Sequence, residues 1–186
     1  MSLGIALASG DDERDDQSTA RRALEGFYRD AFPKLAAAAF QMFGKETAED
    51  LAQQAMLEAC DDWPRLGSMS PGARFNYVRT IMVRAGIGQA EREITLRHLL
   101  PRLWGPQSTE PVESQALNKI EAEEVLELMA ELPVRQRVVL YLLKDDHSIK
   151  EIARIMGITT STVRSHLHQA RKKLKSMISK KEVERA

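Results

Sequence analysis

The sequence predicts an all-α fold of two small helical domains joined by a flexible linker, the C-terminal one a helix-turn-helix. Apolar residues recur at helical spacing along most of the 186 residues, and no run alternates with the period of two that a half-buried strand requires. Residues 98–114 hold three prolines and a glycine and interrupt the helical pattern. Near the C-terminus, two short helical patterns flank a glycine turn, which is the build of a helix-turn-helix.

These patterns divide the chain into four segments. The Pro-rich stretch separates two helical regions, and the mildly apolar opening residues run straight into an acidic stretch. We expect a disordered tail over 1–17, a first domain over 18–97, a linker over 98–115 and a second domain over 116–180.

Composition excludes several classes of protein. Hydrophobic residues make up 43% and charged residues 29% of the chain, as in ordinary globular proteins. No apolar run approaches the roughly 20 residues of a membrane span, and the opening residues lack the basic start of a signal peptide. One cysteine, Cys60, excludes a disulfide framework and a cysteine-based zinc site within one chain. We therefore expect a cytoplasmic protein without membrane contact.

The distribution of charge is more informative than its sum. Lys and Arg number 27, as do Asp and Glu, so the formal net charge is zero. Residues 74–102 nevertheless hold 6 arginines against 2 glutamates, and residues 147–181 hold 9 Lys and Arg against one glutamate. Residues 1–62 and 109–131 are acidic. Two basic blocks predict two surfaces that face DNA.

Three helices are expected in the first domain. The first starts near residue 18, bends at Pro33 and stops at Gly44. Thr47 caps the second, which continues through Trp63. The third begins near residue 73, and each of its two internal glycines weakens it by about 1 kcal/mol relative to alanine.

In the second domain we expect helices near 116–130, 134–143, 148–156 and 160–178. Ile152 and Ala153 face inward from the bracing helix, and Val163 begins the inward stripe of the last helix. A solvated charged face is the alternative explanation for the outward side, but the preceding turn and brace favour DNA. The outward residues suited to base edges and phosphates, with Thr160 as the helix cap, are Thr160, Ser161, Thr162, Arg164, Ser165, His168, Arg171 and Lys172.

Residues 132–175 resemble the C-terminal DNA-binding region of bacterial sigma-70 family factors. This half alone also resembles the output domains of some response regulators. The shared pattern comprises Leu132-Pro133, Gln136-Arg137, Glu151-Ile152-Ala153, Gly157, Thr162-Val163-Arg164-Ser165, Leu167, Ala170-Arg171 and Leu174.

The N-terminal half distinguishes these possibilities. Phe27–Leu35 and Ala48–Trp63 resemble the core-polymerase-binding region of extracytoplasmic-function (ECF) sigma factors, which consist of two helical domains and a linker. The resemblance covers roughly residues 20–178. It implies three partners: the clamp helices and flap of core RNA polymerase, promoter DNA and, in many relatives, an anti-sigma factor.

The resemblance places polymerase contacts on one helix face, with Asp50, Gln53, Gln54 and Leu57. An acidic, glutamine-bearing face suits a protein partner better than DNA; its alternative is a solvated surface. In the C-terminal domain the basic helix would recognise the −35 promoter element.

Recognition and melting of the −10 element would fall to the Pro64–Gly72 loop, which can hold an unstacked base, and to the helix after it. Tyr77 stands where the family usually has Trp, Arg84 where it often has Asn, and Gly88 near its usual Asp, so this part is the least family-like. Tyr77 could equally belong to the core. The candidates for −10 contacts are Arg74, Asn76, Tyr77, Arg79 and Arg84.

The sequence thus predicts an ECF sigma factor that directs promoter-specific initiation. The alternatives are a stand-alone helix-turn-helix regulator and a sigma-like decoy that titrates an anti-sigma protein. No nucleophile–base pair, phosphate-binding glycine loop or metal-ligand spacing occurs, and His166 and His168 point apart on a helix. We expect no enzymatic activity, cofactor, metal or small-molecule substrate.

Overall fold

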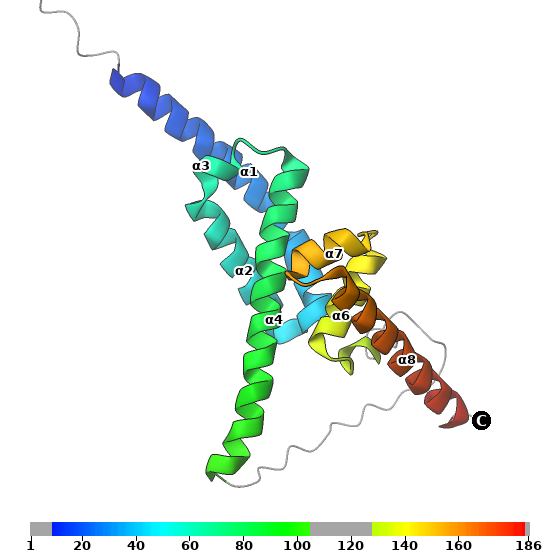
Figure 1. Ribbon diagram of the computed structural model, residues 1–186. Coiled ribbons are helices and arrows are strands. Elements are labelled where there is room, and N and C mark those ends of the chain that lie inside the picture. Colours follow the sequence, from blue (N-terminus) through cyan, green and yellow to red (C-terminus); the bar gives the residue numbers. More distant parts are fainter. Residues whose placement is uncertain (1–8, 105–127, 185–186) are drawn as a thin grey trace, which may run out of the picture.

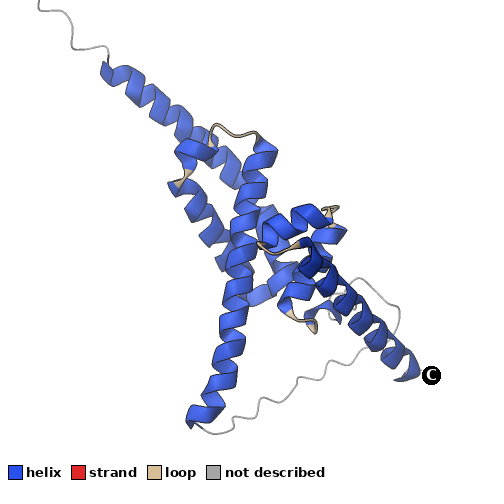
Figure 2. Ribbon diagram, viewed as in Figure 1, coloured by secondary structure: helices blue, strands red, loops and turns tan. Residues whose placement is uncertain are grey.

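Helices are the regular elements of the computed structural model, which describes residues 9–104 and 128–184 (Figure 1). No strand occurs within these ranges (Figure 2), so the predicted all-α class is confirmed. The helices are α1 (Ser9–Phe43), α2 (Lys45–Asp61), α3 (Trp63–Leu66), α4 (Pro71–Trp104), α6 (Val134–Lys144), α7 (Ile149–Met156) and α8 (Thr160–Glu184).

The N-terminal unit consists of α1, α2 and α4, which contact one another, together with the short α3. Alanines allow these helices to pack closely, because a small side chain leaves room for two helix backbones to approach each other. Ala52, Ala55 and Ala59 of α2 and Ala39 of α1 are completely buried. Larger buried side chains fill the remaining space, among them Leu35, Met42, Leu51, Met56, Val78 and Met82.

The first two helices are joined by Gly44 alone. Its φ of 95° lies in the region that favours glycine, and it ends α1 as the sequence predicts. Pro33 lies inside α1 without ending it. The expected cap at Thr47 was wrong: Gly44 is the N-cap residue of α2, and the Thr47 hydroxyl donates to the Phe43 carbonyl at 3.3 Å.

Helix α4 passes through its two glycines without a break. Gly86 is buried, and a Cβ at this position would lie 2.5 Å from Cζ of Phe43. The residue that weakens the isolated helix therefore allows α1 and α4 to approach each other, so packing compensates for its low helix propensity.

The C-terminal unit contains the predicted helix-turn-helix, α7 and α8. A capping box starts α7: the Ser148 hydroxyl accepts from the Glu151 N–H, and the Glu151 carboxylate accepts from the Ser148 N–H at 2.8 Å. Gly157, with φ 66°, ends α7 in the left-handed conformation. The residue that caps α8 is Thr159 rather than the expected Thr160. The Thr159 hydroxyl accepts a hydrogen bond from the N–H of the third residue of α8.

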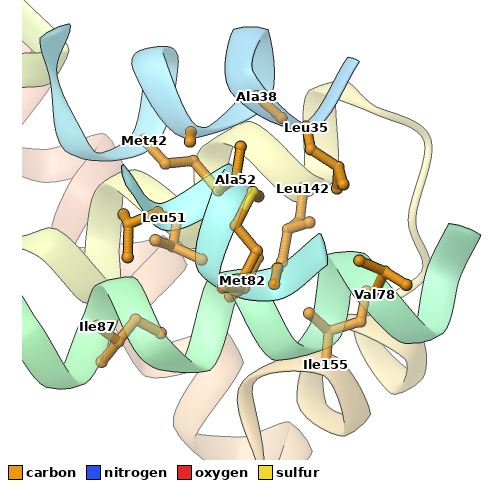
Figure 3. Packing of buried hydrophobic residues seen from close by; sticks show 14 of the residues in the cluster. Leu35, Ala38, Met42, Leu51, Ala52, Val78, Met82, Ile87, Leu142 and Ile155 are labelled. Atoms are coloured by element: carbon orange, nitrogen blue, oxygen red, sulfur yellow. The ribbon is translucent and has the colours of Figure 1, made fainter. Parts of the chain in front are cut away.

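The two units pack against each other. α6 contacts both α1 and α4, and α7 contacts α4. Figure 3 shows Leu142 of α6 and Ile155 of α7 in the same hydrophobic cluster as Leu35, Val78 and Met82 of the N-terminal unit. The described parts of the chain therefore share one continuous core.

Three helices extend beyond the expected limits. α8 continues to Glu184 rather than ending near residue 178. α1 begins at Ser9, inside the segment predicted as a disordered tail, and α4 continues to Trp104, inside the predicted linker. Leucine, a strong helix former, supplies three of the residues 98–104. Most of the helix expected near 116–130 lies outside the described residues.

Candidate nucleic-acid and protein interfaces

The first candidate surface is the outward face of α8. Val163 and Ala170 are fully buried against the unit's core, which fixes the rotation of the helix. The opposite side is exposed at six of the eight predicted residues, while Thr160 and Thr162 are half-buried. The exposed six are Ser161, Arg164, Ser165, His168, Arg171 and Lys172.

At the N-terminal end of this face, threonine and serine hydroxyl groups form hydrogen bonds with one another. The Thr159 Oγ1 lies 2.8 Å from both the Ser161 Oγ and the Thr162 Oγ1. Further along, the Lys173 ammonium donates to the Glu131 carbonyl at 2.7 Å. Within the described residues, Arg164, Arg171 and Lys172 make no hydrogen bond or ion pair with protein groups. These three cations are therefore available to an external anion.

The second candidate surface lies at the start of α4, where Arg74 is already bonded to protein. Its guanidinium donates to the carbonyls of Leu66, Gly67 and Met69 at 2.9, 2.9 and 3.0 Å. It also stacks over Trp63, 4.7 Å from the ring centroid. Arg74 thus holds the end of α3 and the 67–70 turn, which is shorter than the expected Pro64–Gly72 loop because α3 occupies part of it.

Arg79 is buried at the junction of the two units. Only 5% of it is exposed. Its Nη1 lies 2.6 Å from Oδ2 of Asp145, the residue after α6, and its Nη2 donates to the Asn76 side chain at 2.8 Å. The Nε atom is buried without a hydrogen-bond partner in the described structure.

Arg84 reaches the C-terminal end of α7. Its Nε and Nη2 donate to the carbonyls of Ile155 and Arg154 at 3.0 and 2.9 Å. A helix ends in unpaired carbonyls that carry partial negative charge, so a guanidinium here is favourable. One further link joins the units, because Arg135 of α6 donates twice to the carboxylate of Glu91 on α4.

The remaining −10 candidates differ in exposure. Asn76 is exposed, whereas Tyr77 is half-buried with the Arg65 guanidinium 4.5 Å from its ring centroid. The five candidates therefore lie along the N-terminal half of α4, and the guanidinium groups of all three arginines are bonded to protein. Sequence patterns did not identify Asp145, Glu91 or Arg135, since ion pairs between distant segments leave no local spacing.

The third candidate surface is on α2. Asp50, Gln53, Gln54 and Leu57 follow helical spacing and are all exposed, Leu57 at 66%. A leucine this exposed, bordered by a carboxylate and two amides, provides an apolar centre with a polar rim, as protein interfaces do. The buried alanines on the opposite side of α2 hold this face outward.

Two titratable groups near these surfaces favour their neutral forms. Burial, reinforced by the neighbouring Asp61 carboxylate, raises the pKa of the Cys60 thiol, which makes it a poor nucleophile. Burial, together with the nearby Arg135 guanidinium, lowers the pKa of His166. His166 therefore adds no positive charge beside the Arg135–Glu91 pair at neutral pH.

Comparison with known proteins agrees with this two-unit helical architecture. Residues 122–174 match the family model described as "Sigma-70, region 4". The fold is similar to that of the sigma factor RpoE from Bartonella quintana in its co-crystal structure with the anti-sigma factor NepR. The TM-score is 0.58 at 19% identity, over 83% of this chain and 96% of that one. A sequence search of curated proteins finds no match.

The C-terminal unit thus matches region 4 of the sigma-70 family, and the fold of the chain is similar to that of a solved sigma factor. The predicted resemblance is confirmed. Among the described helices, none is long and apolar enough to cross a membrane.

Proposed function

We propose that this chain is an ECF-type sigma factor that binds core RNA polymerase and directs promoter-specific initiation of transcription. The observation that carries the proposal is the region 4 domain at 122–174, whose exposed basic helix face has no partner among the described protein groups. This role needs no catalysis, cofactor, metal or small-molecule substrate. It places the protein in the cytoplasm, with the polymerase.

The region 4 domain would recognise the −35 element. The N-terminal half of α8 would lie in the major groove, with Arg164 and Ser165 near base edges and Arg171 and Lys172 near phosphates. Bidentate arginine contacts to guanine are the commonest specific contacts of this kind, which makes Arg164 the leading candidate for sequence discrimination.

The α2 face would dock on the clamp helices of the polymerase, and the C-terminal unit on its flap. Leu57 supports this role because an exposed leucine within a rim of amides and a carboxylate is suited to burial against a protein partner. The surface is separate from the basic face of α8, so polymerase and −35 DNA could be bound together.

The 67–70 turn and the start of α4 would hold the −10 element as a melted strand. Arg74, bonded to three carbonyls, would act here as a positioning residue that keeps the turn in one conformation. Asn76 is exposed beside it and is suited to a base edge. Tyr77, Arg79 and Arg84 complete the predicted set.

An anti-sigma factor is a further proposed partner. The similar RpoE structure is a complex with the anti-sigma factor NepR, and its likeness to this chain covers both units. An anti-sigma factor would have to cover at least one of the three exposed surfaces described above.

Run-off transcription with purified core polymerase tests the proposal. We expect promoter-dependent transcripts from a genomic template pool only when the chain is added. A stand-alone regulator would instead bind operator DNA without polymerase and yield no transcript. A decoy would bind an anti-sigma protein and yield none either. Absence of any transcript above core enzyme alone would overturn the sigma-factor assignment.

A further inference from the structure

We propose that the guanidinium of Arg65, which lies on the Tyr77 ring and is held by Asp62, is a stacking platform for an unpaired base of single-stranded DNA. This inference rests on the proposed function and deepens it, because Tyr77 belongs to the predicted −10 contacts. Arg65 itself is not one of those contacts. It lies in α3, directly before the turn that leads into α4 (Figure 1).

Arg65 covers one face of the Tyr77 ring. The Cζ atom of Arg65 lies 4.5 Å from the ring centroid, and Tyr77 is half-buried. A base that stacked directly on this face would have to displace the guanidinium. Arg65 is the outer of the two stacked groups, and its side chain is 48% exposed. A strand that reaches this face therefore meets the guanidinium before the ring.

Asp62 fixes the orientation of the guanidinium. Nε of Arg65 donates to Oδ1 and Oδ2 of Asp62 at 3.1 and 2.9 Å, and Nη2 donates to Oδ2 as well. The hydrogen bond from Arg65 is also the main cause that lowers the pKa of the Asp62 carboxyl, with a smaller contribution from Tyr77. The carboxylate is therefore ionised at neutral and mildly acidic pH, and it holds Arg65 in place over this range.

The backbone that carries Arg65 is anchored as well. Its N–H donates to the Asp62 carbonyl at 3.0 Å, and its own carbonyl accepts from the Ser68 hydroxyl at 2.8 Å. The next two carbonyls along the chain accept from Arg74. A group that is ordered before it binds loses less conformational entropy on binding, so this arrangement favours recognition of a ligand.

The same hydrogen bonds favour a base over a phosphate. A guanidinium binds a phosphate through the N–H groups at its edge. The edge of Arg65 formed by Nε and Nη2 faces Asp62, whose negative charge also repels a phosphate. The face of a guanidinium is flat and stacks on bases without regard to their sequence, as arginine does in proteins that bind single strands.

A surface ion pair that serves only the fold is the alternative explanation. The side chains of Asp62 and Arg65 are 35% and 48% exposed, and pairs this exposed contribute little to stability. The two explanations differ in what the loss of Arg65 should change. A platform predicts a loss of base binding in a chain that is as stable as the wild type.

Arg65→Lys tests the platform, because lysine keeps the charge and lacks the planar face. Arg29→Lys is the matched control, since it makes the same exchange at an exposed position of α1. The probe is a labelled random 12-nucleotide single strand, and an abasic strand of the same length is the base-free reference. Fluorescence anisotropy measures the affinity of the full-length chain for both strands, alone and with core RNA polymerase.

We expect Arg65→Lys to weaken binding of the intact strand selectively. The loss should be about 5- to 150-fold, the range for one base stack, and the affinity for the abasic strand should be unchanged. The slope of log affinity against log salt concentration should also be unchanged, because it reports the number of neutralised phosphates. Arg29→Lys should change none of these. If Arg65→Lys fails to fold, Arg65→Met replaces it and should lose at least as much on the intact strand.

Three results would overturn the inference. They are equal affinity of the wild type for intact and abasic strands with and without core enzyme, intact-strand affinity that no Arg65 variant lowers, and a loss in Arg65→Lys that is the same on both strands. Run-off transcription by the wild type separates the two proposals. Without transcripts but with base binding that depends on Arg65, the sigma-factor assignment fails and the platform stands. With transcripts and no such dependence, the platform fails alone.

Discussion

The basic face of α8 and the basic side of α4 look alike in the sequence and differ in the structure. Arg164 and Arg171 project from α8 without a bond to protein within the described residues. On α4, by contrast, Arg74, Arg79 and Arg84 are each bonded to carbonyl, amide or carboxylate oxygens of the chain.

The difference shows that a basic block can serve two purposes. An unbonded surface arginine contributes little to folding and keeps its donors for a ligand. An arginine that satisfies buried or helix-terminal oxygens is part of the structure, and it must give up those bonds before it contacts DNA. The α8 face can therefore meet its proposed DNA partner without rearrangement, whereas the α4 arginines need either rearrangement or a supporting role.

The largest expected effect is on stability. Arg74→Ala removes three hydrogen bonds to carbonyls and a stacking contact with Trp63, so the free energy of unfolding should fall by about 2 kcal/mol. Arg164→Ala is the control and should change it by less than about 0.5 kcal/mol. Urea denaturation followed by circular dichroism measures both. Equal stability losses would remove the distinction between the two regions.

The next effect concerns promoter use. Arg164→Ala should lower transcription from a −35-dependent promoter by about 5- to 150-fold, which corresponds to about 1–3 kcal/mol for one base contact. Polymerase binding should be unchanged, as measured by co-purification with core enzyme. A loss of both activities would indicate that α8 does not act separately from the polymerase surface.

Much of this arrangement could be predicted from local sequence. Helical spacing and the glycine turn predicted α6, α7 and α8 to within a few residues at most ends, because caps and buried stripes are encoded nearby. The cap at Thr159 was missed by one residue, since adjacent threonines offer equivalent hydroxyls. The sequence predicted only that Gly86 weakens its helix. Its contact with Phe43 could not be predicted, because the two residues are far apart in the chain.

The packing of the two units was not predictable in this way. Asp145 and Glu91 look like solvated surface charges in the sequence, and their arginine partners lie 66 and 44 residues away. Such pairs depend on tertiary placement alone. The exposed candidates on α2 and α8 were easier to identify, because an amphipathic helix shows its outward face directly.

A smaller effect is expected at the α7 terminus. Arg84→Ala removes the side-chain donors to the carbonyls of Arg154 and Ile155, and the Arg154 carbonyl keeps only the 3.4 Å bond from the Gly157 N–H. The loss should cost about 1 kcal/mol and speed amide exchange in α7 and the turn after it. Hydrogen–deuterium exchange by mass spectrometry measures this in the absence of DNA. The matched control is Arg92→Ala, at an exposed position of the same helix. If α7 exchanges equally in both variants, Arg84 is not a structural residue.

The smallest expected effect is at the polymerase surface. Gln54→Ala removes one exposed amide from the α2 face and should weaken binding to core enzyme about fivefold, or about 1 kcal/mol, since residues at an interface rim contribute little individually. Titration of labelled chain with core enzyme measures the change.

With Gln54→Ala, added core enzyme should restore promoter use to the wild-type level, because −35 recognition is intact. With Arg164→Ala it should not, since a lost base contact is not recovered by saturating the polymerase. Saturation that rescues both variants, or neither, would show that the two surfaces do not work independently.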